Sequence, residues 1–290
     1  MGRSISNCML STISGLIVFI YIALPAIADD RLPIIDMHVH YNKPAWEVFE
    51  PTYVKKLFDE AKVSRVLVSS WPDKGSRVLK KAYPQIVVPT FRPYVGEIMA
   101  RNWTRYPQHV LPHMRERLAK MRYAGIGEIH IYNMNGVDWD VVSAVMKIAR
   151  QNNLFIHVHS VEDVIDRLYE IDPNIDILWA HTGLGLSAEI VDATMKKHKG
   201  LMAELSLRAI NIMPDIEDDD PEITASWRKV LMTHQDRLMI GSDTYINFAW
   251  ADYGELIDAH RRWLAKLPPE VARKIAYKNA ESFLAKWYEN

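Results

Sequence analysis

Ile34-Ile35-Asp36-Met37-His38-Val39-His40 joins a short apolar run to two histidines separated by one residue. Side chains alternate between the faces of an extended strand, so His38 and His40 point the same way, about 7 Å apart along the strand. Two imidazoles placed in this way can share one metal ion. The same pattern also arises when one histidine is hydrogen-bonded in a core and the other is exposed, so later strands must supply further ligands.

Short apolar strands alternate with amphipathic helices after this stretch. Further strands are predicted at residues 64–69, 85–91, 127–132, 154–159, 175–180, 201–205 and 238–240, and helices at 51–62, 78–83, 107–123, 140–152, 162–170 and 188–197. We expect Gly125 to cap the 107–123 helix. Strands that alternate with helices run parallel, and eight such units close into a (β/α)8 TIM barrel, the α/β fold class that we predict. A doubly wound open sheet is the alternative, but no phosphate-binding glycine motif follows the first strand.

The composition is that of a globular protein with a sizeable core: 290 residues, 49% hydrophobic and 24% charged. The formal net charge is -1, which gives no electrostatic basis for binding nucleic acid or an anionic membrane. The expected partner is therefore a small-molecule substrate. The sequence predicts no particular oligomeric state.

Residues 1–28 differ from the rest of the chain. Arg3 is their only charged residue, an apolar run extends from Met9 to Leu24, and Ala26-Ile27-Ala28 has the small-x-small form of a cleavage site. We predict a secretory signal peptide that is cleaved after Ala28, which leaves a single barrel domain at 29–290 in the periplasm or outside the cell, without a stable membrane anchor. A retained anchor is the alternative, but the apolar run is short for a bilayer span.

Cys8 is the only cysteine and lies within this predicted signal peptide, so the mature chain would contain no thiol. A metal site in it must use histidine, carboxylate or modified lysine ligands, which suit a divalent ion, with zinc favoured. In a barrel the active site forms at the carboxyl ends of the strands. Ligand-type residues recur at that end in His38, His40, Glu128, His157, His159, His181 and Asp243. Together they predict one metal centre.

This ordered series resembles the metal-dependent amidohydrolase superfamily, and within it the amidohydrolase-related (amidohydrolase 2-like) branch, which includes lactonases and decarboxylases. The resemblance spans the mature chain, with motifs at residues 36–40, 127–130, 156–160, 178–183, 241–244 and 279–284. It implies that His38, His40 and Asp243 bind the more buried metal, while a strand-five histidine and His181 hold a second ion or orient substrate. Many relatives carry a carboxylated lysine where this chain has Glu128, so both one ion and two ions stay open.

Two histidines compete for the strand-five position. Alternation puts His157 and His159 on the same inward face, and His159 is favoured because it lies nearer the end of the strand. Two arginines are candidates for binding a substrate carboxylate: Arg92 after strand three and Arg208 after strand seven. Each could instead form a structural salt bridge, and Glu204 is the candidate partner of Arg208.

The predicted chemistry follows from the metal. Zinc lowers the pKa of bound water from about 15.7 to about 7. Asp243 can take a proton from that water and pass it to the leaving group, while the metal or His181 polarises the carbonyl. We therefore expect a hydrolase that acts on a small-molecule amide, ester or lactone. A non-oxidative decarboxylase on the same site and a catalytically inactive periplasmic binding protein are the alternatives.

Overall fold

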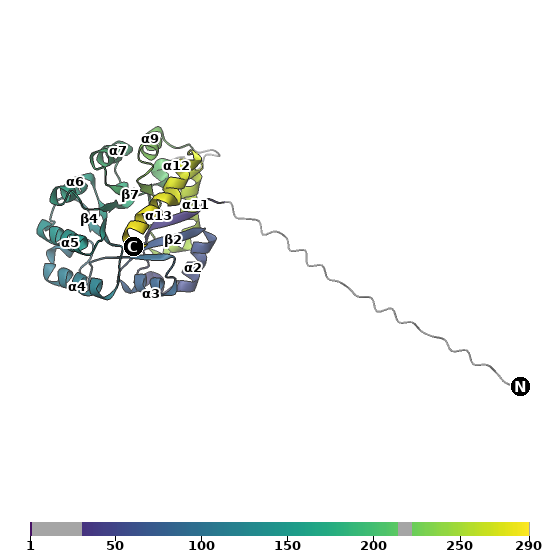
Figure 1. The fold of residues 1–290 in the computed structure, drawn as a ribbon, viewed down its shortest axis with the longest axis horizontal. Coiled ribbons are helices and arrows are strands. Elements are labelled where there is room, and N and C mark those ends of the chain that lie inside the picture. The colour runs from purple at the N-terminus through teal and green to yellow at the C-terminus, as the bar shows by residue number, and fades with distance from the viewer. Residues whose placement is uncertain (2–30, 214–221, 290) are drawn as a thin grey trace. The chain divides into compact units, whose positions relative to one another are not determined.

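Eight parallel strands form the centre of the computed structural model, which describes Met1, residues 31–213 and residues 222–289. The strands are β1 (Ile34–Val39), β2 (Val63–Ser70), β3 (Val87–Phe91), β4 (Gly125–Ile131), β5 (Phe155–Ser160), β6 (Ile177–Trp179), β7 (Met202–Glu204) and β8 (Leu238–Met239). They lie side by side in chain order, and the amide of Met37 donates to the carbonyl of Ile240 across the seam between β1 and β8. This is a (β/α)8 barrel, so the predicted fold class is confirmed (Figure 1).

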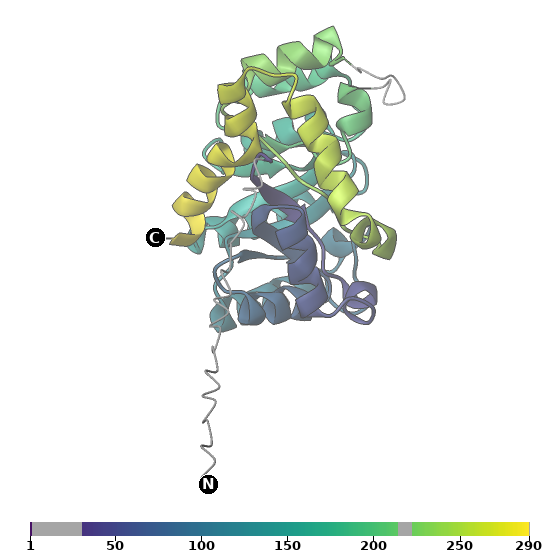
Figure 2. The ribbon, with the colours of Figure 1, turned by 90° about the vertical axis from the view of Figure 1, so that its right-hand side faces the viewer.

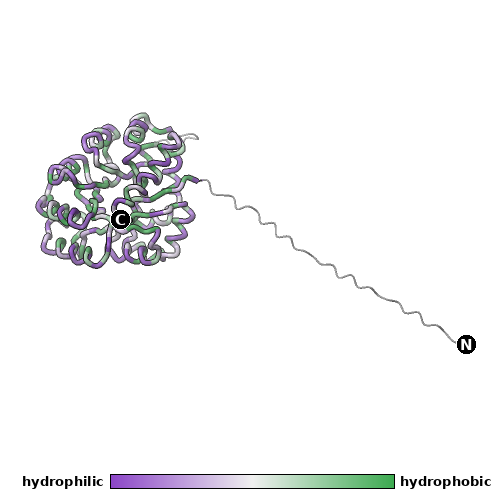
Figure 3. Tube along the Cα trace, viewed as in Figure 1, coloured by the Kyte–Doolittle hydropathy of each residue, from purple (hydrophilic) through white to green (hydrophobic). Residues whose placement is uncertain are grey.

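Helices cover the outside of this barrel, as the two ribbon views show (Figures 1 and 2). They are α1 (Lys43–Trp46), α2 (Pro51–Glu60), α3 (Lys74–Ala82), α4 (Pro107–Lys120), α5 (Trp139–Gln151), α6 (Glu162–Ile171), α7 (Ala188–Lys197), α8 (Ala209–Ile212), α9 (Ala225–Thr233), α10 (Asn247–Ala251), α11 (Tyr253–Leu264), α12 (Pro269–Arg273) and α13 (Asn279–Leu284). Short 3-10 turns lie at Trp103–Arg105 and Ala180–Thr182, and π-helical turns at Lys274–Lys278 and Ala285–Glu289. Hydrophobic and hydrophilic residues alternate along the outer helices, as expected for helices with one buried face (Figure 3).

The predicted elements up to residue 205 all occur, with shifted ends. The third helix, α4, ends at Lys120, so Gly125 does not cap it and instead begins β4. A Cβ atom at Gly125 would overlap the ring of Phe155 on β5, so close packing of two strands explains this glycine. The short helix α1 and the helices α8 to α13, which follow β7 and β8, had no counterpart in the sequence prediction.

The amino-terminal end of the barrel is closed by apolar side chains. Ile35, Leu67 and Phe155 point inward there and pack against Phe283 of α13, whose ring centroid lies 4.7 Å from that of Phe155. Figure 1 shows α13 lying across the barrel. The polar residues that line the cavity lie at the other end, where the strands finish.

A register shift in β1 turns His38 inward, and His40 follows directly after the strand. The pairing of β1 with β2 is irregular between Asp36 and Val39. Met37 belongs to the apolar layer at the bottom of the barrel, and the next residue, His38, also faces the interior. Such an irregularity lets two successive side chains enter the same side of a strand. The irregular pairing therefore leaves Met37 in the apolar cluster at the bottom of the barrel and places His38 and His40 among the polar residues at its other end.

The predicted signal peptide at 1–28 falls, apart from Met1, outside the residues that the structure describes. Among the described helices, none combines the length and the apolar composition that crossing a bilayer requires.

Candidate metal centre

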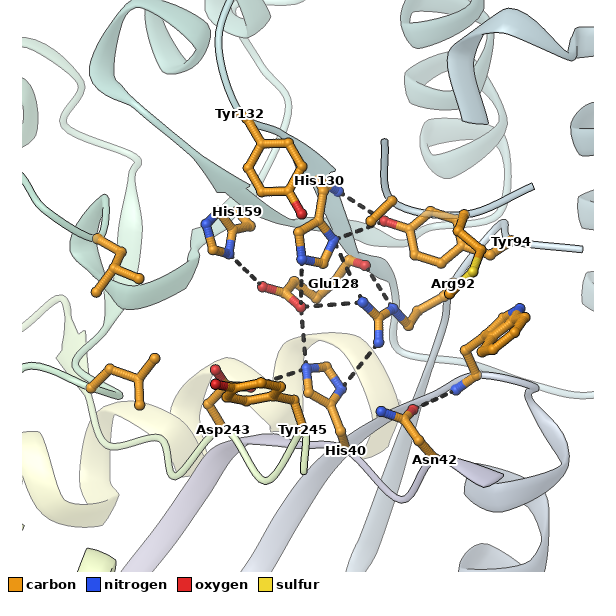
Figure 4. A pocket seen from close by; sticks show the side chains of 15 residues that line it. His40, Asn42, Arg92, Tyr94, Glu128, His130, Tyr132, His159, Asp243 and Tyr245 are labelled. Carbon is orange, nitrogen blue, oxygen red and sulfur yellow. Dashed lines mark hydrogen bonds and ion pairs between the residues drawn. The ribbon is translucent and has the colours of Figure 1, made fainter. Parts of the chain in front are cut away.

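A cavity of about 390 Å³ opens at the carboxyl ends of the strands (Figure 4). It is lined by the predicted site residues His40, Arg92, Glu128, His159 and Asp243, which come from five different strands or the loops after them. His38 and His181 are fully buried and contact this set from behind. The structure therefore gathers these histidines and carboxylates in one place.

The two histidines of β1 meet the carboxylate of Asp243. Their Nε2 atoms are 3.0 Å apart, and Asp243 Oδ1 lies 3.2 Å from His40 Nε2 and 3.6 Å from His38 Nε2. Asp243 has a φ of +53°, a left-handed conformation that aspartate tolerates better than most residues, and its amide donates to the carbonyl of His38 at 2.7 Å. The loop after β8 is thereby fixed against β1.

Glu128 joins this group to a second one. Its Oε2 lies 3.1 Å from His40 Nε2, while its Oε1 lies 3.1 Å from His159 Nδ1 and 3.3 Å from His181 Nε2. The preceding residue must be glycine, because Gly127 has a φ of +139° and a Cβ there would overlap the carbonyl of His157. One carboxylate thus presents its two oxygens to two different sets of imidazoles.

The tautomers of three histidines follow from the partners of their Nδ1 atoms. His38 Nδ1 lies 2.9 Å from Glu204 Oε1, His40 Nδ1 contacts the carbonyl of Ser69, and His181 Nδ1 lies 2.6 Å from Ser206 Oγ. Each of these partners accepts a hydrogen bond, so each Nδ1 carries the proton and each Nε2 carries a lone pair. All three Nε2 lone pairs then face the carboxylates of Glu128 and Asp243.

When these imidazoles are neutral, their Nε2 lone pairs and the two carboxylates converge on the same small space. Burial raises the pKa values of Glu128 and Asp243, but neighbouring histidines outweigh it and hold both below their ordinary values. Burial lowers the pKa of His38, yet Asp243, Glu128 and Glu204 raise it well above its ordinary value. The site therefore favours positive charge, and ligand atoms of His38, His40 and Asp243 all lie within 4.8 Å of one another. This buried donor set fits a divalent metal ion.

The structure separates the two histidines of β5. His159 lines the cavity beside Glu128, whereas His157 is fully buried below it, with its ring centroid 4.6 Å from that of His38. Neither ring nitrogen of His157 has a hydrogen-bond partner among the described residues. His157 shares a cluster with His38 and Glu204, but His38 Nδ1 and Glu204 already satisfy each other. His159 is thus the histidine of β5 that reaches Glu128.

Arg92 lies at the side of the cavity. Its Nε donates to the carbonyl of Glu128 at 3.1 Å, and its guanidinium carbon lies 5.0 Å from the centroid of the Tyr94 ring. The terminal nitrogen Nη2 stands 3.5 Å from Glu128 Oε2, which is too long for a strong hydrogen bond. One edge of the guanidinium is therefore fixed, and the other is directed towards the cavity and Glu128 (Figure 4).

Arg208 is not brought to the cavity. Its nitrogens donate to the carbonyls of His181, Thr182, Gly183 and Leu186 at 2.6 to 3.0 Å. These bonds hold the turn after β6, in which His181, Thr182 and Gly183 all have a positive φ. The structure records no ion pair between Arg208 and Glu204 among the described residues. In this geometry Arg208 supports the His181 turn rather than a substrate.

Replacing Arg208 with alanine is expected to lower the free energy of unfolding by about 3 kcal/mol or more, because several buried carbonyls lose a charged donor. It should lower kcat through displacement of His181, with little change in KM. Urea denaturation and steady-state kinetics test this, with Arg92→Ala as the comparison inside the cavity. A large rise in KM at unchanged stability would instead make Arg208 a substrate ligand.

Three residues that hold the imidazoles were not predicted in that role, although Glu204 was named as a candidate partner of Arg208. Glu204 and Ser206 at the end of β7 and Ser69 on β2 hold the imidazoles, and the end of a barrel strand was the signal that could have identified them. His130 lines the cavity and contacts the Tyr94 hydroxyl at 2.9 Å. Burial lowers the pKa of His130 to about 3, so this imidazole is neutral.

The sequence matches no protein-family model and no curated protein. Among solved structures, the chain is similar to 4-oxalomesaconate hydratase from Rhodopseudomonas palustris, with a TM-score of 0.57 and 10% identity over 87% of this chain and 96% of that one. It is also similar to the phosphotriesterase homology protein from Escherichia coli, with a TM-score of 0.57 and 12% identity over 88% and 99% of the two chains. A probable 2-pyrone-4,6-dicarboxylic acid hydrolase from Acinetobacter baumannii gives a TM-score of 0.51 and 11% identity over 87% and 99%. At such identities the likeness shows a shared fold.

Proposed function

We propose that this chain is a metal-dependent hydrolase of the amidohydrolase type, which cleaves an amide, ester or lactone in a small molecule. The convergence of the His38, His40 and His181 Nε2 atoms on the carboxylates of Glu128 and Asp243 carries the proposal. The hydrolase and hydratase names of the structural neighbours support the same class. Zinc is the proposed ion, because imidazole and carboxylate ligands without thiolates suit it.

When bound, a divalent ion would polarise a carbonyl and lower the pKa of water towards neutrality. Asp243 is the proposed general base: its carboxylate reaches the cavity and is ionised at neutral pH. After taking a proton from water, it can deliver that proton to the leaving group. The burial of His38 and His181 behind the cavity keeps their ring nitrogens away from bulk water.

Glu128 supports the binding of two ions. Its Oε2 faces His38 and His40, while its Oε1 faces His159 and His181. A carboxylate in this position can contribute one oxygen to each of two neighbouring cations. We therefore propose that His38, His40 and Asp243 hold one ion and that His159 and His181 hold the other.

The proposed substrate carries a carboxylate that pairs with Arg92. The guanidinium is anchored on the Glu128 carbonyl and lines the cavity, where a planar fork can bind a carboxylate through two hydrogen bonds. One structural neighbour is named for a dicarboxylic acid substrate, which is consistent with this chemistry. Trp71, Tyr132 and Tyr245 provide flat apolar walls around the same space.

The proposed mature protein starts at Asp29 and works in the periplasm or outside the cell, without a membrane anchor. The support is the sequence of residues 1–28, with its apolar run and its small residues before Asp29.

Metal removal tests the function. Purified mature protein should contain a divalent ion, lose hydrolysis of a panel of lactones, esters and amides after treatment with a chelator, and recover it with Zn²⁺. Each acid in the panel is paired with its methyl ester, and the ester should be the poorer substrate if a carboxylate is recognised. Release of carbon dioxide would show that the reaction is a decarboxylation and not a hydrolysis. Tight binding without turnover would indicate a binding protein. Protein that neither holds nor responds to any divalent ion contradicts the proposal.

A further inference from the structure

Glu204 is a buried carboxylate that belongs to none of the groups facing the cavity. It ends β7, is fully buried, and does not line the cavity. Its Oε1 accepts from the backbone amide of His181 at 2.6 Å and lies 2.9 Å from His38 Nδ1. Its Oε2 accepts from the backbone amide of Ser206 at 2.7 Å. One side chain thus connects β1, β7 and the turn after β6.

The hydroxyl of Ser206 extends this connection to a second imidazole. Ser206 Oγ donates to Glu204 Oε1 at 3.0 Å, which uses its only proton. Its oxygen can then only accept from His181 Nδ1, 2.6 Å away. Glu204 therefore sets the protonated nitrogen of His38 directly and that of His181 through Ser206.

The backbone leaves room for this carboxylate. A Cβ atom at Gly241, after β8, would overlap Glu204 Oε2 and press on His38 Cβ. Glycine at this position is what allows the carboxylate to lie directly beneath His38. Backbone amides donate to both oxygens of this carboxylate, that of His181 to Oε1 and that of Ser206 to Oε2, so its position is fixed from two sides.

We propose that Glu204 is a positioning residue that, with Ser206, fixes the tautomer and the orientation of both His38 and His181 for a divalent cation. This inference rests on the proposed function, because it assigns those imidazoles to a metal. A hydrogen bond from the far nitrogen of a metal-binding histidine to a carboxylate fixes the ring and makes its other nitrogen a stronger ligand. Here the Glu204 carboxylate holds His38, which faces Glu128 Oε2, directly, and His181, which faces Glu128 Oε1, through Ser206.

The test measures the metal affinity of the full mature chain rather than its activity. Zn²⁺ affinity is measured by competition with a chromophoric chelator, and the visible spectrum of the Co²⁺-loaded protein reports ligand geometry. Glu204→Gln keeps the side-chain volume but presents an amide NH2 to donors such as the Ser206 amide. We expect it to weaken Zn²⁺ binding by about 10- to 100-fold and to change the Co²⁺ spectrum.

The chain offers a matched control. Asp192 Oδ1 and His234 Nε2 form a buried carboxylate–imidazole pair of the same length, 2.9 Å, on α7 and after α9, and neither lines the cavity. Asp192→Asn should alter the melting temperature without altering Zn²⁺ affinity or the Co²⁺ spectrum. Ser206→Ala should weaken Zn²⁺ binding less than Glu204→Gln, and it provides the test if the glutamine variant does not fold.

The outcomes separate the two proposals. If the wild-type protein binds no Zn²⁺ or Co²⁺, the proposed function fails. If the wild-type protein binds the ions and Glu204→Gln binds them equally well, only the positioning role fails, and Ser206→Ala decides in the same way where the glutamine variant is unfolded. Equal weakening by Asp192→Asn would also overturn it, because a general loss of stability would then explain the effect.

Discussion

Replacing Asp243 with asparagine is expected to lower kcat by about 10²- to 10⁴-fold, the range that loss of a general base produces. Asp243 Oδ1 lies 3.2 Å from His40 Nε2, and Oδ2 lies 3.9 Å from His181 Nε2, so the carboxylate spans the centre. Burial raises the pKa of Asp243, but the nearby histidines, His38 foremost, lower it by more than burial raises it. The carboxyl group is therefore an ionised acceptor at neutral pH. Asparagine has the same size but cannot take up a proton from water.

The fold should tolerate this change. The backbone amide of Asp243, not its side chain, bonds the carbonyl of His38, and asparagine is also tolerated at a φ of +53°. Steady-state kinetics is measured together with the metal content of each preparation, so that loss of the base is distinguished from loss of the ion. Asp192→Asn, at a buried carboxylate outside the cavity, should keep wild-type kcat. A metal-loaded Asp243→Asn protein that retains a tenth or more of wild-type kcat would exclude the assigned role.

The barrel could be predicted because its strands are apolar runs bounded by turns. A strand that is buried on both faces is visible in the sequence as a continuous apolar run, whichever strand it pairs with. The helices after β7 and β8 could not be predicted in this way. Helices α8, α10 and α12 are only four or five residues long, too short to show a helical period. The role of α13 is also non-local, because its Asn279 donates to the carbonyls of Gln235 and Leu238 and its apolar residues fill the base of the barrel.

The candidate site was predictable to the extent that strand ends meet at one edge of the barrel. That rule placed Glu128, His181 and Asp243 together, although they are far apart in sequence. It did not reveal partners beneath the site: Glu204 stands four residues before Arg208, and this proximity suggested an ion pair, but closure of the barrel puts Glu204 under His38. Arg208 donates hydrogen bonds to the turn at His181, which has positive φ angles. No local sequence pattern predicts that conformation, so this role of Arg208 could not be predicted.

Replacing Glu128 with glutamine is expected to remove both ions and to lower activity by at least about 10²-fold, the upper end of the effect of losing an outer partner of a ligand. The wild-type carboxylate lies 3.1 to 3.3 Å from ring nitrogens of His40, His159 and His181, while the nearest arginine nitrogen, Arg92 Nη2, is 3.5 Å away. A glutamine NH2 group can donate hydrogen bonds to those nitrogens, so the protein itself would satisfy them and a cation would no longer be needed. The variant should therefore be folded and free of metal.

His159→Ala is the matched comparison, because His159 bonds the Oε1 atom of Glu128, on the side of the second proposed ion. It should lose one ion and keep the other, whereas Glu128→Gln should lose both. Elemental analysis of the protein measures the ions per chain, and thermal melts with and without added Zn²⁺ check the fold. If His159→Ala and Glu128→Gln lose the same number of ions, Glu128 does not bridge two sites. If Glu128→Gln keeps the wild-type ion content, the carboxylate between the two groups of imidazoles is not a metal ligand at all, and its burial among five histidines would have to serve the fold alone.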